Sequence, residues 1–332
     1  MRGRDAIFFV GVTLLALILF VCDILLGSTQ MDVGEVWRAL VDGTGDNAEI
    51  IRLIRLPKAV AALLCGAALG ASGLQMQTLF RNPLAGPYVL GVSSGASLGV
   101  ALCIFGAHLL GGENPVSSLG MAGAAWIGAA LIFLLIVAVS RRVNDVMVVL
   151  ILGVMFGSVA SALVEVMQYF GSESDVKSYV VWTMGSLGRV TIEQLYVMAP
   201  SVAVGLVLAL LSIKPLNALM LGERYAATMG VDVRRSRILI LVSTTLLAGT
   251  VTAFCGPIGF LGLAVPHIVR MMTDRANHRV LMPGSMIAGA AIMLLCDIAS
   301  RVGELTLPIN TVTALVGVPI IIVVIIKGRR GR

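Results

Sequence analysis

The sequence predicts an all-α fold, a polytopic helical membrane protein with about ten transmembrane helices and both termini in the cytoplasm. Three observations predict it. Of the 332 residues, 58% are hydrophobic and 13% are charged, which is about half the charged fraction of an ordinary soluble domain. The apolar residues fall into runs that match the thickness of a bilayer. The basic residues collect on one side of those runs, which indicates the orientation.

Ten segments are candidate spans, because a transmembrane helix needs about 20 mostly apolar residues. The first has a basic start, as a signal peptide has, but its length is that of a span and no small-residue cleavage site follows. The eighth is short and rich in glycine, and an even number of crossings favours including it. In order, the segments are Ala6–Leu26, Ala59–Phe80, Tyr88–Leu110, Met121–Val139, Val146–Tyr169, Leu195–Ile213, Ile238–Cys255, Pro257–Met272, Met282–Ser300 and Pro308–Ile326.

The charge distribution supports this topology. With the N-terminus inside, 17 of the 24 lysines and arginines lie on the inner side and 7 on the outer side. Without the short eighth span, the C-terminal basic cluster would lie outside. The net charge of +6 is therefore explained by the excess of basic residues in cytoplasmic loops. No aromatic-rich basic module is present, so nucleic-acid binding is not expected.

Two outer segments and one inner loop are long. Gly27–Ile54 is polar and contains a predicted surface helix, Val33–Val41. The second outer segment contains Tyr179–Met184, which is apolar but too short to cross and is expected to be a half-helix at the outer mouth. The inner loop, Lys214–Arg237, is too short to be a domain. Residues 1–332 are therefore predicted to form a single membrane domain.

Glycines recur every four residues in two of the spans. Gly66 and Gly70 share one face of the second span, and Gly91, Gly95 and Gly99 share one face of the third. Such faces let a neighbouring helix approach closely, so they predict packing and no chemistry. The five cysteines fit no metal-ligand pattern, and neither a metal site nor a cofactor is predicted.

Three carboxylates lie within or beside the spans, where ionisable side chains are costly and often functional. Asp23 is near a span end and is expected to reach the interface. Asp297 precedes Arg301 by four residues, which favours a local ion pair. Glu165 and Gln168 share a face of the fifth span. They predict either a water-filled pathway or a helix–helix hydrogen bond, and the sequence does not decide between the two.

Motifs for catalysis and nucleotide binding are weak or missing. Ser72 lies in Gly70-Ala71-Ser72-Gly73, a string that also occurs in intramembrane serine proteases, and His267 is the one histidine placed to act as a base. Small-residue-rich helices produce such strings by chance. No Gly-Lys pair occurs, which excludes the usual phosphate-binding loop. The chain is not expected to be an enzyme, and any ATPase activity would belong to a partner.

The chain carries, in this order, the motifs Arg55-Leu56-Pro57-Lys58, Gln75-Met76-Gln77, Phe80-Arg81-Asn82-Pro83-Leu84-Ala85, Leu221-Gly222-Glu223, Gly256-Pro257-Ile258-Gly259-Phe260-Leu261-Gly262 and Leu307-Pro308. Together they resemble the FecCD permease family, the membrane subunits of type II ABC importers for cobalamin, haem and ferric siderophores. The matches run from about Arg55 to about Pro319, which is nearly the whole chain.

This resemblance implies a permease subunit that moves a metal chelate from the periplasm to the cytoplasm across the bacterial inner membrane. The implied partners are a second copy of the chain, two cytoplasmic ATP-binding-cassette ATPase subunits and a periplasmic or lipid-anchored binding protein. ATP hydrolysis on the partners would drive transport. The chelate itself, whether ferric siderophore, haem or cobalamin, cannot be identified from the sequence.

The resemblance also implies four groups of functional residues. The residues expected to dock the binding protein are Arg55, Lys58 and Arg301. The residues expected to form the cytoplasmic gate are Asn82, Leu84, Asn144 and Asp145. The residues expected to couple the chain to the ATPase are Glu223, Arg224, Ala226, Ala227, Gly230 and Arg234. The residues expected to line the translocation path are Glu165, Met167 and Gln168.

Two alternative functions come from other classes. An ion-coupled secondary transporter would use Glu165 and Asp297 as coupling carboxylates. An intramembrane serine protease would use Ser72 as its nucleophile.

Overall fold

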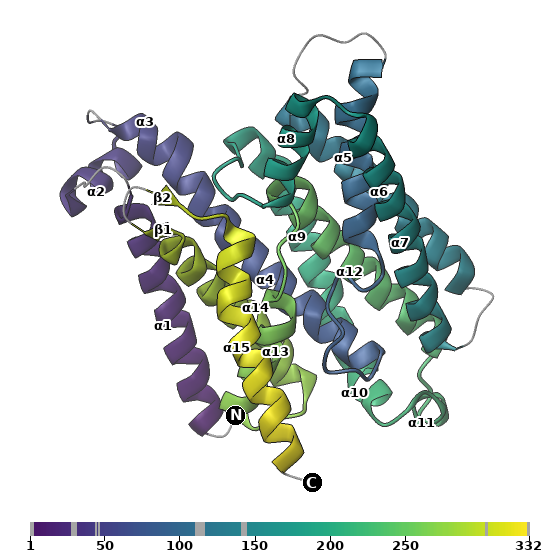
Figure 1. Ribbon diagram of the computed structural model, residues 1–332. Helices are drawn as coiled ribbons and strands as arrows, with labels where there is room; N and C mark the ends of the chain where they lie inside the picture. The colour runs from purple at the N-terminus through teal and green to yellow at the C-terminus, as the bar shows by residue number, and fades with distance from the viewer. Residues whose placement is uncertain are drawn as a thin grey trace.

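The computed structural model describes residues 3–27, 32–43, 45, 47–109, 117–140, 145–302 and 305–330, and these residues are almost entirely helical (Figure 1). The elements are α1 (Gly3–Leu25), α2 (Val33–Val41), α3 (Ala48–Ile50), η1 (Ile51–Arg55), α4 (Leu56–Leu79), α5 (Val92–Leu109), α6 (Ser118–Ser140), α7 (Val146–Phe170), α8 (Glu173–Thr183), α9 (Ile192–Leu211), α10 (Ile213–Met220), α11 (Glu223–Thr228), α12 (Val233–Cys255), α13 (Leu261–Thr273), α14 (His278–Ala299), β1 (Arg301–Val302), β2 (Leu305–Thr306) and α15 (Ile309–Arg330).

Seven of the described helices are long and apolar enough to cross a membrane, namely α1, α4 with its N-terminal extension, α6, α7, α9, α12 and α14. Three shorter apolar helices, α5, α13 and α15, account for the other predicted segments, and all ten occur in the predicted order. The prediction of a polytopic helical membrane protein is therefore confirmed.

The short elements are divided between the two ends of the helical bundle. The N-terminus and the C-terminus lie at one end together with α10 and α11, whereas α2, α3, α8 and the two-residue strands lie at the other (Figure 1). This division agrees with the orientation that the basic residues predict. The predicted surface helix, α2, has the expected bounds, Val33–Val41, and its N-cap is Asp32. The expected half-helix is α8.

The second span is longer than its apolar run. The helix begins at Ala48, passes through the π-helical turn η1 and continues without a break to Leu79. Pro57 lies in the first turn of α4 and has no N–H to donate to the preceding turn, which explains the irregular helix just before it. Arg52 and Arg55 made this segment resemble a loop in the sequence.

The eighth predicted span is a helix that crosses only part of the membrane. α13 has 13 residues, and at about 1.5 Å per residue it is roughly 20 Å long, shorter than the hydrocarbon core. Residues 256–260 before it are not helical. Their backbone groups find partners within the protein: Gly259 N–H donates to Asn310 Oδ1 at 2.9 Å, and Gly256 N–H donates to the Thr252 carbonyl at 2.9 Å. Such backbone is tolerated at membrane depth only where protein covers it.

The core is built around α4, which is buried along most of its length. At Gly66 a Cβ atom would collide with the Gly289 carbonyl of α14, and at Gly70 with the Ser285 carbonyl. Gly95 of α5 and Gly128 of α6 face each other in the same way. The glycine faces predicted from four-residue spacing therefore do hold helices in backbone contact.

A buried polar cluster joins α4 to two other helices. The Gln75 side chain is fully buried, and its Nε2 donates to Ser212 Oγ at 3.1 Å. Its Oε1 accepts from Thr244 Oγ1 at 3.0 Å. Ser212 ends α9 and Thr244 lies in α12. The amide is thus satisfied, which removes the penalty of burying it.

We expect Gly66→Ala to destabilise the protein, because the added methyl group has no space between α4 and α14. Overpacking of this kind costs about 1–3 kcal/mol. Gly11→Ala is the matched control, since nothing lies within 4 Å of a Cβ atom at that position of α1. Thermal unfolding of the purified chain in detergent should show a lower melting temperature for the first variant alone. Equal melting temperatures would contradict the close contact.

Candidate functional site

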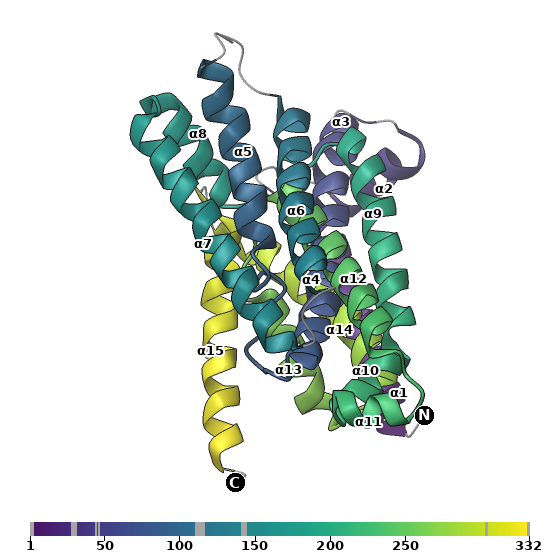
Figure 2. The same ribbon diagram turned by 90° about the vertical axis from the view of Figure 1, so that its right-hand side faces the viewer.

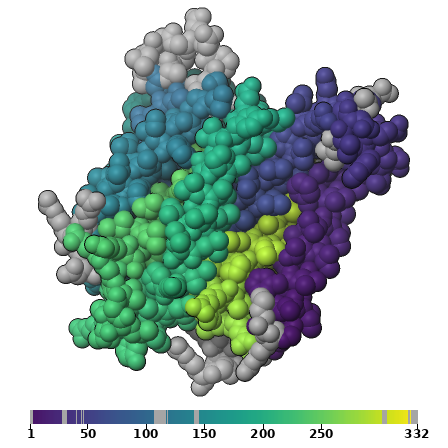
Figure 3. All heavy atoms as spheres, turned by 180° about the vertical axis from the view of Figure 1, so that it is seen from behind, coloured from purple at the N-terminus to yellow at the C-terminus, as the bar shows by residue number. Residues whose placement is uncertain are grey.

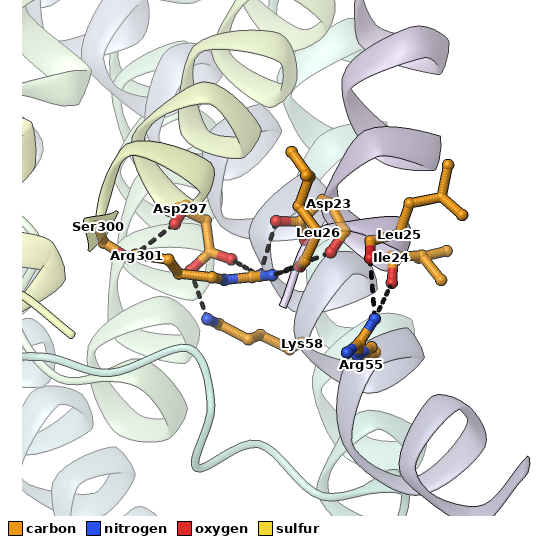
Figure 4. A network of polar contacts seen from close by, with 9 residues as sticks. All are labelled: Asp23, Ile24, Leu25, Leu26, Arg55, Lys58, Asp297, Ser300 and Arg301. Carbon is orange, nitrogen blue, oxygen red and sulfur yellow. Dashed lines mark hydrogen bonds and ion pairs between the residues drawn. The ribbon is translucent and has the colours of Figure 1, made fainter. Parts of the chain in front are cut away.

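A cluster of buried charges joins α1, α4 and α14 at the predicted outer end (Figure 4). Arg301 Nη2 donates to Asp23 Oδ1 at 2.7 Å and also contacts Asp297 Oδ2. Lys58 Nζ lies 3.1 Å from Asp297 Oδ1. The side chains of Asp23 and Asp297 are 0% and 2% exposed. Two cations therefore compensate two carboxylates that have almost no access to solvent.

Two guanidinium groups also bind the end of α1. Arg55 Nη1 donates to the carbonyl oxygens of Ile24 and Leu25 at 2.9 and 3.0 Å. Arg301 Nη1 donates to the Asp23 carbonyl at 3.0 Å. The last carbonyl groups of a helix have no partner within the helix and carry partial negative charge. Arg55 and Arg301 satisfy them.

The structure thus brings together the three residues predicted to dock a binding protein, but in contact with their own chain. Arg55 is 7% exposed, and the side chains of Lys58 and Arg301 are 18% and 16% exposed. Their docking role stays a prediction. The local ion pair between Asp297 and Arg301 is confirmed. The expectation that Asp23 reaches the membrane interface was wrong. Its side chain is fully buried and forms a hydrogen bond with Arg301, which lies 278 positions later in the sequence.

A pocket of about 360 Å³ lies beside this cluster and is lined in part by Lys58, Asp297 and Arg189. Arg189 follows α8 in a loop, and its Nη2 donates to the Val181 carbonyl at 3.2 Å. Partial burial lowers the pKa of Arg189 from its usual value. Arg189 is one of the seven basic residues predicted to lie outside, and it is not among the predicted docking residues.

A polar groove of about 590 Å³ runs between α5 and α7. Ser158, Ser161 and Glu165 line it from α7, and Ser94 lines it from α5. Ser161 Oγ donates to Ser94 Oγ at 3.4 Å. Glu165 is exposed and is the one carboxylate among the described residues that line the groove.

This geometry favours the pathway interpretation of Glu165 over a helix–helix hydrogen bond. No described residue forms a hydrogen bond with the Glu165 side chain. Ser158, Ser161, Glu165 and Gln168 are spaced by three or four residues, so they form one stripe along α7. Met167 is not on that stripe: it packs against the core and does not line the groove. Ser158 and Ser161, which were not among the predicted path residues, line the groove instead.

Three of the predicted gate residues, Asn82, Leu84 and Asp145, lie at or beside helix ends. The Asn82 side chain accepts a hydrogen bond from the Leu84 N–H at 2.9 Å, and Leu84 is 48% exposed. Asp145 is the N-cap of α7 and accepts from the Met147 N–H at 2.8 Å. The Asp145 carboxylate thus caps the N-terminus of α7, which is a structural role for an acidic residue at this position. Asn144 lies outside the described residues.

The predicted coupling loop forms α10, α11 and the start of α12. Glu223 of α11 pairs with Arg237 of α12 at 2.9 Å, which links the two helices. Ala226 is fully buried within the chain, so it is not placed to contact a partner directly, and its role in coupling stays a prediction. Ala227 and Arg224 are exposed. Arg234 is also on this segment and exposed.

Three large apolar side chains cover the free face of this loop. Leu221 is 63% exposed, Tyr225 59% and Met229 58%. Gly230 has a positive φ of 81°, and nothing lies within 4 Å of a Cβ atom there. Its conformation, and not close packing within the chain, therefore requires glycine. Exposed apolar surfaces of this kind are typical of partner-binding sites.

The serine and histidine do not form a catalytic pair. Ser72 is fully buried, and its Oγ donates to the Ala68 carbonyl at 2.7 Å, within its own helix. His267 Nε2 donates to the Pro83 carbonyl at 2.8 Å. The geometry gives the serine neither a base nor access for a substrate.

We expect Arg301→Met to destabilise the protein strongly, because two buried carboxylates would then share one lysine. Breaking a buried ion pair costs about 3–5 kcal/mol. Arg235→Met is the control, since Arg235 and Asp232 form an ion pair with side chains that are 89% and 53% exposed. Unfolding in denaturant should separate the two variants. Similar stabilities would show that the cluster contributes little.

The comparisons with known proteins agree with this architecture. Residues 14–327 match the family described as the FecCD transport family. The chain is 39% identical over 323 residues to the vitamin B12 import system permease protein BtuC of Shigella boydii, covering 96% of this chain and 93% of that protein. It is also 39% identical over 303 residues to BtuC of Salmonella typhimurium, covering 90% of each.

Among solved structures, the fold is similar to an inward-facing conformation of a metal-chelate type ABC transporter. The TM-score is 0.86 at 31% sequence identity, and the match covers 97% of this chain and 99% of that one. A family match over nearly the whole length, together with this likeness of fold, identifies the chain as a member of the FecCD transport family.

Proposed function

We propose that the chain is the permease subunit of an ATP-binding-cassette importer and carries a metal chelate, with cobalamin as the first candidate, across the bacterial inner membrane. The observation that carries the proposal is the 39% identity to vitamin B12 import permeases over 96% of the chain. Residues 1–332 form its single transmembrane domain. The chain makes no covalent chemistry of its own.

The polar groove between α5 and α7 is the proposed wall of the translocation path. α7 and α15 lie along the same side of the molecule (Figure 2), and a second copy of the chain would face this side. The path then runs between the two copies. Hydroxyl groups of Ser94, Ser158 and Ser161 can form hydrogen bonds with a polar chelate without binding it tightly. Asn82, Leu84, Asn144 and Asp145 remain the proposed inner gate.

The exposed, cytoplasmic face of α11 is the proposed contact with the ATPase. Leu221, Tyr225 and Met229 supply an apolar centre, and Arg224 and Arg234 supply charge at its edge. This arrangement fits an interface with an apolar core and a polar rim. Closure of the ATPase dimer on ATP would move α11, and the Glu223–Arg237 pair would pass that movement to α12.

At the outer end, Lys58 and Arg189 are the proposed contacts with a binding protein, because both line the outer pocket. Acidic side chains on that protein would complement them and orient docking. Arg55 and Arg301 act in this proposal by holding α1 in place. Asp297 is sealed between Lys58 and Arg301, which argues against its use as a coupling carboxylate in a secondary transporter.

The function is tested by uptake in cells that lack the chain. Uptake of labelled cyanocobalamin, ferric siderophore or haem should fail for one chelate and return when the chain is restored. Depletion of ATP with the membrane potential maintained should abolish it. Uptake that continues under those conditions would contradict an ABC importer and support ion coupling.

We expect Ser158→Trp to block chelate uptake while ATP hydrolysis by the assembled transporter continues, because the indole would fill the groove. Val159→Trp is the matched control: Val159 is the next residue, is 60% exposed and does not line the groove. Uptake into proteoliposomes and phosphate release measure the two activities. Normal uptake by the first variant would place the path elsewhere.

We expect Met229→Glu to release the ATPase subunit from the complex, because a carboxylate would enter the apolar centre of the interface. Met272→Glu is the control, an exposed methionine at the inner end of α13, 49% exposed against 58% for Met229. Co-purification of the ATPase with each variant is the measurement. Loss of the ATPase from both variants, or from neither, would contradict the assignment.

A further inference from the structure

A second pocket at the inner end is basic, and its two cationic residues, Lys214 and Arg279, have no role in the proposed transport cycle. It has a volume of about 470 Å³ and lies between α10 and the start of α14. Lys214 and Arg279 line it, and no acidic residue is among the described residues that line it. Both side chains are exposed, and neither pairs with a described residue. Two uncompensated positive charges therefore face one cavity.

Hydrogen bonds link the two sides of this basic pocket. Asn217 Nδ2 donates to Asn277 Oδ1 at 3.1 Å, and Asn217 Oδ1 accepts from the His278 N–H at 2.9 Å. Asn277 Oδ1 also accepts from the Arg279 N–H at 2.9 Å and so caps α14. These hydrogen bonds tie the loop before α14, which supplies Ala276 and Asn277 to the pocket, to α10.

The electric field of the α14 backbone adds to the positive charge of the Lys214 and Arg279 side chains. α14 is a helix of 22 residues, and its N-terminus opens on the basic pocket. A helix N-terminus carries partial positive charge, which favours an anion. Lys214, Arg279 and this helix end therefore act in the same direction.

The surface next to the basic pocket is apolar. Val207, Leu210 and Leu211 on the last turns of α9 are 55%, 44% and 63% exposed. Leu211 precedes Lys214 by three residues. Seen from behind, α14 is visible between α9 and α1, so this side of the bundle presents a continuous surface of transmembrane helices (Figure 3). The matching occupant has an anionic head and apolar chains.

We propose that this basic pocket binds the headgroup phosphate of an anionic phospholipid from the inner leaflet, with the acyl chains along α9. Basic pockets between helices on the cytoplasmic side are suited to such headgroups. Met220 and Leu221 also line the pocket, and Leu221 belongs to the proposed ATPase contact as well. A bound lipid would therefore hold α10 against α14 beside the segment that contacts the ATPase. This proposal does not depend on which molecule the transporter carries.

The test uses the transporter purified in detergent with its ATPase subunits. Native mass spectrometry counts bound dioleoylphosphatidylglycerol against dioleoylphosphatidylcholine in competition. The wild type should retain the anionic lipid preferentially. Lys214→Gln with Arg279→Gln should lower that preference by roughly fivefold for each charge removed. Lys214→Arg with Arg279→Lys should keep it, because both charges remain.

The control is Arg4→Gln with Arg235→Gln, which removes two exposed charges from the inner end without touching the basic pocket. It should bind lipid as the wild type does. An equal loss in this control would mean that the inner surface attracts lipid as a whole, and the site would be rejected. It would also be rejected if millimolar glycerol phosphate displaced the lipid, or if binding occurred only without the ATPase.

Discussion

The fold depends on the absence of side chains along one face of α4. Lipid offers no hydrophobic driving force for helices to associate, so they must gain energy from close contact. Gly66 and Gly70 allow the backbone of α4 to touch that of α14. Because α4 is thereby fixed in the centre, side chains at its two ends can bind charged residues of other helices. Lys58 at one end meets Asp297, and Gln77 at the other meets Arg270.

A second constraint is that buried polar groups need partners where water is absent. Among the described residues only a few buried side-chain atoms lack one. Arg55 and Arg301 bind the carbonyl end of α1, and Asn310 binds the backbone before α13. Charged side chains thus stabilise the packing of α1 at the outer end. The resemblance predicted a docking surface at the same place. The two roles are compatible for Lys58, which contacts Asp297 and also lines a pocket.

Local patterns in the sequence predicted the features that depend on neighbouring residues. The helix Val33–Val41, the glycine faces and the pair of Asp297 with Arg301 all follow from spacing within a few positions. The burial of Asp23 and of Ala226 does not, because it depends on residues that approach from other helices. Glu165 was identified as polar within a span, but its access to a groove required the position of α5. The boundaries of α13 were missed because composition does not reveal where a helix breaks.

The contact between α1 and Arg301 has a consequence for the synthesis of the protein. Asp23 and Arg301 are separated by 278 positions. At about 5–20 residues per second, the ribosome needs roughly 15–60 s to make the intervening chain. During that interval the first helix is already available for insertion, but its carboxylate has no arginine partner. The contacts of α1 are therefore incomplete until β1, which carries Arg301, has been made.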